Sequence, residues 1–506
     1  MLGAAFLVAV VAAGLAFVLR ISGNDSVVLT GGSSYVEGVS GTWQRVNPLF
    51  ASANEVDADL TELVFAGLVR IGPDGQVLPD MAELPRITDD GRTYTFTLRK
   101  DLKWHDGQTV TSRDVAFTVR TLTSSDFGGD QALAEGWRGA DIDLPDDQTF
   151  VVKLRQASAP FLARSATVGI LPEHLLGTVP VRQLEDTPFN ASPIGSGPYR
   201  VESLDSREAR LVANPDYHLG RPGVERLTLK FYTDDASATR ALQSGDVRGL
   251  LLRESVAQGQ LTDLQKVKDT RVDQLNRSTQ VLMYLNTTNT LFRDQRVRQA
   301  ISLGLNRTSI VEKEFVGAAT ASSSPIAPRT WAYVGEYDHV DQDVEQARAL
   351  LKEAGWEPSP TTGILTRGGQ EFRFTIRVDN DPVRFAVAND IATQLTQLGI
   401  RAAVASTTFT VFNLDYLVPR RYEAAIATWE QGPDPDPYFG WHSSQMGTAG
   451  LNLGNFEDPV ADELISKGRT STDIDVRKDS YRQFQEIWQD LQPGIVIAYP
   501  HAVYAH

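Results

Sequence analysis

From residue 27 onward, segments with an apolar residue at every second position alternate with segments whose apolar residues are three or four positions apart. This alternation limits the folds that the chain can adopt. Thr93–Arg99 reads TYTFTLR, with apolar side chains at every second position, as in a half-buried strand. Glu225–Tyr232 follows the same period of two. Val383–Leu398 instead spaces apolar residues three and four apart and is followed by Gly399, which predicts a helix that ends at a glycine. Short strands that alternate with amphipathic helices predict an α/β fold.

The size and charge of the chain limit the number of domains and the kinds of partner that we expect. With 506 residues it is too long for one compact hydrophobic core, so we expect about three domains. Its 64 acidic side chains exceed its 48 basic ones, which gives a net charge of −16 at pH 7. An acidic chain without a Lys/Arg-rich run repels phosphate backbones, so we expect no nucleic-acid partner. The chain has no cysteine, which excludes disulfides, thiolate zinc ligands and a lipid attached through an N-terminal cysteine.

The N-terminal segment predicts a contact with a membrane. Residues 2–19 carry no charge and are followed by Arg20; as a helix they would be about 27 Å long, close to the thickness of a bilayer core. This exceeds the apolar core of a usual signal peptide, which has about 7–15 residues. We therefore expect residues 1–22 to form an export signal that remains as a transmembrane anchor. Cleavage near Ala12–Gly14 stays open as the alternative.

The motifs of common catalytic sites are missing from the sequence. There is no G-x-S-x-G nucleophile elbow and no Gly-Lys pair of a phosphate-binding loop, and the seven histidines never pair at i, i+4 as zinc-hydrolase ligands do. We therefore predict no catalytic residue, no cofactor and no metal. The paired carboxylates of a glycosidase can be recognised only in three dimensions, so a secreted hydrolase remains the alternative from another class.

One irregular segment has the composition of a ligand-binding wall. Residues 429–445 read WEQGPDPDPYFGWHSSQ, which combines aromatic rings, polar side chains and three prolines. Rings with polar tips are typical of ligand pockets. Packing between structural elements is the alternative for the same rings.

Six segments, taken in order, resemble the extracellular solute-binding proteins, family 5, of peptide/nickel-type ABC importers. They are FAGL from Phe65, YTFTLRKDLKWHDGQTVTSRDVAFTV from Tyr94, GSGPYR from Gly195, YLNTTNTLFRDQRVRQAISLGLNRTSIVEKEFVG from Tyr284, LKEAGW from Leu351 and WEQGPDPDPYFGWHSSQ from Trp429. The resemblance covers roughly residues 27–500. Six matches in one order are specific, whereas any one of them alone would be weak.

The resemblance implies a periplasmic-binding-protein type II-like clamshell of two lobes with three structural domains, preceded by the N-terminal signal/anchor helix. The implied segments are 1–22 for the helix, 27–66, 189–278 and 485–506 for domain Ia, 67–188 for domain Ib and 279–484 for domain II. Chain crossings near Thr279–Asn286 and near Pro493 would act as the hinge, with the ligand buried between the closing lobes. Family members usually continue past the position of His506, so the last part of domain Ia is expected to be shortened.

The implied function is that of an extracytoplasmic receptor, in the periplasm or at the outer face of the cytoplasmic membrane. It would be a membrane-anchored monomer that captures a peptide or a related small solute and delivers it to the permease subunits of an ABC importer. An oligosaccharide-binding receptor and a sensory receptor of the same fold are the alternatives.

The resemblance also suggests where the ligand lies. Ala53–Glu55 would meet the ligand backbone from domain Ia, residues 429–445 would form the facing wall, and Arg377 or Arg384 would bind a carboxylate. The residues expected to bind ligand are Asn54, Glu55, Arg377, Trp429, Glu430, Gln431, Tyr438 and Trp441. Peptide-binding members commonly place an Asp three residues after the tryptophan, where this chain has Gly432. We therefore expect either a ligand without a free amine, or an amine held by Glu430, Asp434 or Glu55.

Overall fold

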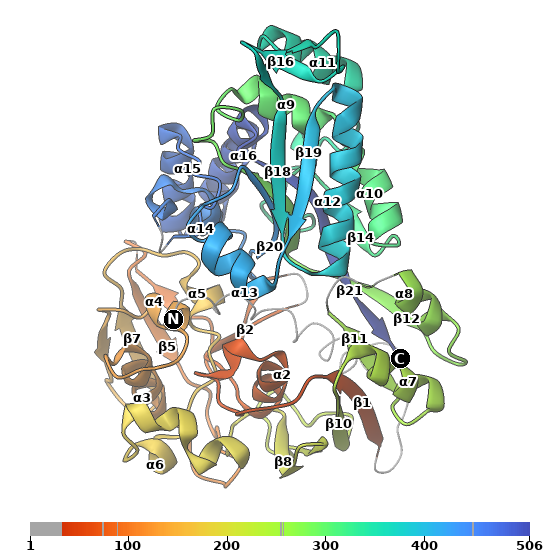
Figure 1. Cartoon of the computed structure of the whole chain (residues 1–506). Helices are drawn as coiled ribbons and strands as arrows, with labels where there is room; N and C mark the ends of the chain where they lie inside the picture. The colour runs from red at the N-terminus through yellow and green to blue at the C-terminus, as the bar shows by residue number, and fades with distance from the viewer. Residues whose placement is uncertain (1–32, 73–74, 89, 254–255, 257, 448–449) are drawn as a thin grey trace.

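The protein has two lobes, one above the other in Figure 1. The computed structural model describes residues 33–506 except 73–74, 89, 254–255, 257 and 448–449. Strands and helices alternate through both lobes, which confirms the α/β class. The helix expected within residues 1–22 lies outside the described residues. In the part of the chain that the structure describes, no helix is both long and apolar enough to span a bilayer.

Twelve of the described strands belong to one sheet that runs through both lobes. Its order is β19-β18-β20-β13-β21-β11-β1-β10-β9-β8, and β12 and β14 also pair with β21. These strands are β1 Ser34–Ser40, β8 Tyr199–Leu204, β9 Glu208–Ala213, β10 Arg226–Tyr232, β11 Gly249–Leu252, β12 Val272–Asn276, β13 Thr279–Leu285, β14 Ala319–Ala321, β18 Arg373–Val378, β19 Arg401–Ser406, β20 Ala424–Glu430 and β21 Gly494–Ala505.

The lower lobe contains the β1 end of this sheet and a second, four-stranded sheet of order β4-β5-β7-β6. The further strands are β2 Val69–Ile71, β3 Val77–Pro79, β4 Arg86–Ile87, β5 Thr93–Thr97, β6 Asp141–Asp143 and β7 Thr149–Lys153. Its helices are α2 Glu55–Val64, α3 Ser112–Thr123, α4 Gln131–Glu135, α5 Phe161–Arg164, α6 Glu173–Leu176, α7 Asp235–Ser244 and α8 Gln258–Gln265. A single hydrophobic cluster, which includes residues from Val39 to Leu229, fills most of this lobe.

The upper lobe is built on β13, β18, β19 and β20, with helices packed around them (Figure 1). The helices are α9 Gln295–Leu303, α10 Arg307–Glu314, α11 Val344–Glu353, α12 Pro382–Leu395, α13 Phe409–Val411, α14 Tyr438–Trp441, α15 Pro459–Thr470 and α16 Ile474–Leu491. A small sheet combines β15 Glu357–Pro358, β16 Leu365–Arg367 and β17 Gln370–Glu371. The lobe has its own hydrophobic clusters, so each lobe has a separate core.

The helix expected over Val383–Leu398 shows how local sequence sets an element. α12 begins at Pro382, and the Asp381 carboxylate caps it by accepting a hydrogen bond from the Arg384 backbone N–H at 2.7 Å. A short 3₁₀ turn continues the helix to Leu398. Gly399 then adopts a left-handed φ of 77°, which ends the helix as predicted.

The twelve-residue strand β21 connects the lobes. Its first part, Gly494–Ala498, pairs with β13 of the upper lobe, and its last part, His501–Ala505, pairs with β12 of the lower lobe. β12 and β13 are themselves separated by two residues, Arg277 and Ser278. Both chain crossings therefore lie at the same level. Pro500 sits where β21 changes partner, and a proline has no backbone N–H to donate to a ladder.

The second crossing differs from the expected one near Pro493. Residues 485–491 belong to α16, which packs on α15, and residues 494–498 still pair with the upper-lobe strand β13. The segment 485–498 is therefore part of the upper lobe and not of domain Ia. The sequence of β21, GIVIAYPHAVYA, is mostly apolar along its whole length. Its hydrophobic pattern therefore does not show where the chain passes from the upper lobe to the lower one. The other boundaries of domains Ia, Ib and II stay predictions.

We predict that Gly249→Ala destabilises the lower lobe. A Cβ at position 249 would lie 2.1 Å from Glu37 Oε2 and 2.2 Å from the Tyr35 hydroxyl, inside van der Waals contact. Overpacking of this kind costs about 1–3 kcal/mol of unfolding free energy, which chemical denaturation would measure. Gly259→Ala in α8 is the control, because nothing lies within 4 Å of the added Cβ. Equal stabilities of the two variants would contradict the prediction.

Candidate functional site

The carboxyl ends of parallel strands meet at the lobe boundary. β18 pairs in parallel with β19 and with β20, and Figure 1 shows the ends of β18 and β19 directed toward the lower lobe. In open α/β sheets, ligands bind in the crevice outside these ends. Arg377 lies near the end of β18, and Trp429 and Glu430 form the end of β20. Three of the residues expected from the sequence, Arg377, Trp429 and Glu430, thus lie at the edge of the sheet that faces the other lobe.

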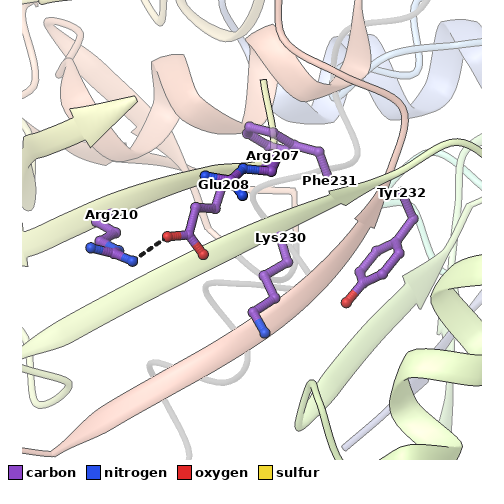
Figure 2. Close-up of a pocket in the computed structure, with 6 residues that line it drawn as sticks. All are labelled: Arg207, Glu208, Arg210, Lys230, Phe231 and Tyr232. Carbon is purple, nitrogen blue, oxygen red and sulfur yellow. Dashed lines mark ion pairs between the residues drawn. The ribbon is translucent and has the colours of Figure 1, made fainter. Parts of the chain in front are cut away.

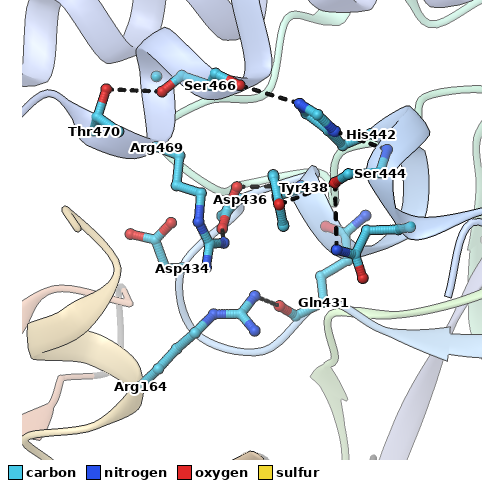
Figure 3. Close-up of polar contacts among 12 residues, drawn as sticks. Arg164, Gln431, Asp434, Asp436, Tyr438, His442, Ser444, Ser466, Arg469 and Thr470 are labelled. Carbon is cyan, nitrogen blue, oxygen red and sulfur yellow. Dashed lines mark hydrogen bonds and ion pairs between the residues drawn. The ribbon is translucent and has the colours of Figure 1, made fainter. Parts of the chain in front are cut away.

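Gln431 and Arg164 form a direct contact between the lobes (Figure 3). The Gln431 side-chain oxygen accepts a hydrogen bond from the Ala327 backbone N–H at 3.0 Å, which positions the residue from within the upper lobe. Its backbone carbonyl accepts a hydrogen bond from Arg164 Nη2, at the end of α5 in the lower lobe, at 2.9 Å. The Arg164 guanidinium also lies 5.4 Å from the centre of the Phe439 ring. Gln431, which the sequence analysis predicted to bind ligand, is therefore buried, and its side chain and backbone carbonyl both accept hydrogen bonds from the protein.

The two aspartates of the loop after β20 are both paired with arginines. Asp434 makes a two-pronged contact with Arg477, at 2.7 and 3.0 Å. Asp436 is bonded to Arg469 and receives a longer hydrogen bond, 3.4 Å, from the Tyr481 hydroxyl. Asp434, one of the carboxylates considered for holding a ligand amine, is thus held inside the upper lobe. Figure 3 shows the contact between Asp436 and Arg469.

The backbone conformation at position 432 favours glycine. Its φ is +74°, in the left-handed region that favours glycine. Arg164 Nη2 would be 3.9 Å from an added Cβ, so space alone does not exclude a side chain there. The loop conformation after β20 therefore favours glycine at this position.

The aromatic residues of segment 429–445 differ in their surroundings: one is packed in the hydrophobic core and others are half-buried. Trp441 is only 2% exposed and packs edge-on against Trp488, with ring centres 5.4 Å apart. It has the packing role that was the alternative for this segment, and not the ligand-wall role expected of it. Trp429 is half-buried at the end of β20. Tyr438 is half-buried as well, with its hydroxyl 3.0 Å from Ser444 Oγ and the Arg469 guanidinium over its ring.

The two arginines considered for a ligand carboxylate differ in their contacts. Arg384 is held by Asp379 at 2.7 and 3.0 Å, so its charge is matched within the upper lobe. Arg377 is half-buried, and its guanidinium lies over the Tyr416 ring, 4.3 Å from the ring centre. An aromatic ring attracts a cation but does not neutralise it. Arg377 is therefore the better placed of the two for an anionic group.

Asn54 and Glu55 begin α2 in the lower lobe. Asn54 caps the helix: its side-chain oxygen accepts from the Val56 N–H at 2.9 Å, and its amide donates to the Thr42 carbonyl at 2.9 Å. Glu55 is half-buried and lies 3.5 Å from Arg253. Asn54 thus has a structural role in the described conformation, while Glu55 presents its carboxylate to an arginine that follows β11.

Glu430 lies buried beside the crossing between the lobes. Its carboxylate accepts hydrogen bonds from the hydroxyls of Ser278 and Thr279, and Arg277 Nη2 is 3.9 Å away. Arg277 also donates a hydrogen bond to the Arg253 carbonyl. Charged groups of the two lobes are therefore linked through the residues between β12 and β13.

The sequence analysis missed a cluster of buried carboxylates formed by α2 and β1. Asp59 pairs with Arg253, and burial raises the pKa of Asp59 to about 6 while the Arg253 charge acts against the rise. Burial also raises the pKa of Glu37 on β1 to about 8, although the Tyr504 hydroxyl donates to it at 3.2 Å. The spacing of Glu55 and Asp59, one helical turn apart, was the signal available in the sequence.

A shallow hollow lies elsewhere on the lower lobe (Figure 2). It has a volume of about 470 Å³ and is lined by Arg207, Glu208, Arg210, Lys230, Phe231 and Tyr232 of β9, β10 and the residue before β9. Three of its charged side chains form ion pairs, Arg210 with Glu208 and Lys230 with Asp246. Among the described residues, no group of three or more His, Cys, Asp or Glu side chains is arranged to hold a metal ion.

The two lobes have separate cores and are joined by short crossings at one level. Polar and aromatic groups line the region where the lobes meet. These features define the class of two-lobed binding proteins. The chain belongs to the bacterial extracellular solute-binding proteins, family 5, since the sequence profile of the middle part of that family matches residues 76–450. This finding confirms the resemblance described from the six segments.

Individual relatives agree with the family. The chain is 28% identical to the oligopeptide-binding protein AppA of Bacillus subtilis over 93% of its length and 87% of the relative, and 30% identical to protein XP55 of Streptomyces lividans over 90% and 81%. The structure of B. subtilis AppA in complex with a nonapeptide matches with a TM-score of 0.72 over 94% of both chains. The ABC transporter substrate-binding protein CtaP of Listeria monocytogenes matches at 24% identity with a TM-score of 0.81 over 94% of both chains. These likenesses support the periplasmic-binding-protein type II-like fold.

We predict that Trp441→Ala acts on stability. Removing a buried aromatic side chain from a packed cluster costs about 3–5 kcal/mol of unfolding free energy. Trp429→Ala, at a half-buried position of the same segment, is expected to cost clearly less. Thermal and chemical denaturation of the two variants would measure the difference. An unchanged melting temperature for Trp441→Ala would contradict the packing role.

Proposed function

We propose that the protein is an extracytoplasmic receptor of an ABC importer that captures peptides between its two lobes and delivers them to membrane permease subunits. The observation that carries the proposal is the full-length likeness to oligopeptide-binding AppA in both sequence and structure. The position of Arg377 and Trp429 at the carboxyl ends of β18 and β20, where the other lobe closes the boundary, supports it.

Capture would follow from the way the lobes are joined. The two crossings, Arg277–Ser278 and the middle of β21, lie at one level, so the lobes can turn about them while each core stays intact. Arg164 would link the lobes in the closed form through the Gln431 carbonyl. A ligand that contacts both lobes favours this closed form because it binds the open form less tightly.

We infer that the receptor performs no chemistry on its ligand. The two carboxylates of the boundary loop, Asp434 and Asp436, are engaged by Arg477 and Arg469. A carboxylate bound by an arginine is poorly placed to move a proton to or from a ligand. The ligand would therefore be released unchanged to the permease.

The first experiment offers the purified chain a synthetic pool of random nonapeptides and identifies retained peptides by mass spectrometry. Retained peptides should be recovered intact, and Trp429→Ala should weaken their binding by roughly 1–3 kcal/mol if the ring stacks on ligand. Cleaved peptides in proportion to protein would favour the hydrolase. Retention of an oligosaccharide pool in place of the peptides would favour the sugar-binding alternative.

We also propose that residues 1–22 tether a monomeric receptor to the outer face of the cytoplasmic membrane. An uncharged segment of eighteen residues is long enough to span the bilayer core. The full chain should sediment with membranes and become accessible to external protease when the outer layers are removed, whereas a chain that begins at Gly23 should not sediment. A full chain that stays in the soluble fraction would contradict the tether.

A further inference from the structure

The lobes meet at a second junction, away from the crossings. Arg164, at the end of α5, donates a hydrogen bond to the Gln431 carbonyl at 2.9 Å. The backbone N–H of Ala159, two residues before α5, donates to the Arg469 carbonyl near the end of α15, also at 2.9 Å. In Figure 1, α5 and α15 lie to the left of β21, where the chain crosses between the lobes. The boundary is therefore bridged at two separate places.

The ring of Phe439 lies near a cation from each lobe. The Arg164 guanidinium is 5.4 Å from the ring centre, and the Arg469 guanidinium is 4.9 Å from it. Arg469 is paired with Asp436 of its own lobe, whereas Arg164 is held in the upper lobe by a carbonyl oxygen and the face of a ring. When the lobes separate, Arg164 can be hydrated again and leaves no carboxylate buried without its partner. The junction is therefore built to break and form again.

A third contact extends the junction. Gly91 lies between β4 and β5 of the lower lobe, and Thr472 lies between α15 and α16 of the upper lobe. A Cβ built on Gly91 would be 3.2 Å from Thr472 Cγ2, which is close van der Waals contact. The upper-lobe partners of the junction thus come from the loop after β20 and from the end of α15.

The two junctions differ in polarity. At the crossing, one hydrophobic cluster combines Leu250 of β11 with Val503 of β21 and with Ala318, which precedes β14. At the other junction, in the part of the chain that the structure describes, the buried cluster with Phe161 contains residues between 39 and 229, and the cluster with Trp441 contains residues between 282 and 499. Neither cluster extends across the boundary. Separating apolar surfaces exposes them to water, whereas polar groups exchange their contacts for hydration at little net cost. The polar junction is therefore the one that opens.

We propose that this polar junction, which we call the clasp, is the gate through which a ligand enters and leaves the space between the lobes. The clasp consists of Ala159 and Arg164 of the lower lobe and Gln431, Phe439 and Arg469 of the upper lobe. The inference rests on the proposed function and adds the step that limits ligand exchange. The Arg164 hydrogen bond must break before a ligand is released, so the clasp sets the rate of release while the crossings keep the lobes together.

The first experiment measures release from the chain loaded with the random nonapeptide pool. Arg164→Ala should release the retained peptides about tenfold faster than the wild type, because a hydrogen bond from a charged donor is lost. Arg164→Lys keeps the charge and should give an intermediate rate. Arg182→Ala, which changes an exposed arginine of the same lobe, is the matched control and should release at the wild-type rate. Unchanged release from Arg164→Ala would overturn the clasp.

A disulfide tests the clasp independently of Arg164. The chain has no cysteine, so Gly91→Cys combined with Thr472→Cys introduces a single pair, at positions that meet across the boundary. After oxidation of this variant, added peptides should bind about tenfold or more slowly than to the reduced form, and peptides loaded before oxidation should be retained. In the Arg164→Ala background the same disulfide should restore slow release. A direct contact between Arg164 and the ligand would give no such rescue.

The outcomes separate the clasp from peptide capture. If the oxidised and reduced forms take up peptides at the same rate, peptide capture stands and the clasp is overturned. If the wild type retains no peptide, peptide capture falls, and disulfide formation without peptide still supports the closing contact. A cysteine pair that stays reduced in a folded variant overturns the clasp in either case. Circular dichroism and the melting temperature would show folding, since residue 91 has a left-handed φ of +65°. If the cysteine variant does not fold, the release rates of Arg164→Ala and Arg182→Ala decide.

Discussion

The backbone pairing of β21 is the interaction on which the two-lobed arrangement depends. One strand supplies hydrogen bonds to β13 and β14 near its start and to β12 and β11 near its end, so it is a member of both halves of the sheet. Its side chains enter hydrophobic clusters of both lobes, Ile495 and Ile497 in the upper lobe and Val503 and Ala505 in a smaller cluster of the lower lobe, so both lobes pack on the same strand. The strand therefore passes from one lobe to the other within the few residues where it changes partners.

Charge pairing shapes the boundary between the lobes. Arg477 and Arg469 hold the loop after β20 through Asp434 and Asp436, and Arg164 reaches that loop from the opposite lobe. Such buried pairs add little to stability on balance, because each charge loses its hydration. They specify one loop conformation, which includes the left-handed backbone of Gly432.

Local residues sufficed to predict several elements of the fold. The apolar spacing of Val383–Leu398 and the glycine that follows it predicted both the helix α12 and its end at Gly399. The irregular segment after β20 contacts the other lobe through Gln431 and Arg164, and Glu55 and Glu430 lie near arginines. The ligand-binding role of these residues stays a prediction. Trp441 could not be assigned from its sequence, because a tryptophan in a proline-rich loop has the same pattern whether its ring faces a ligand or, as here, Trp488. Asp59 was overlooked because a charged residue on a helix usually faces bulk solvent.

The sequence by itself determined the α/β class, the family and the absence of familiar catalytic motifs, because these depend on periodicity and on short motifs that are read along the chain. Tertiary structure alone decided which lobe residues 485–498 join and which aspartates form ion pairs with arginines. Those outcomes depend on contacts such as Arg477 with Asp434 and Arg253 with Asp59, whose partners are 43 and 194 residues apart. No local pattern encodes such pairings, since burial and partner choice arise only when distant segments pack together.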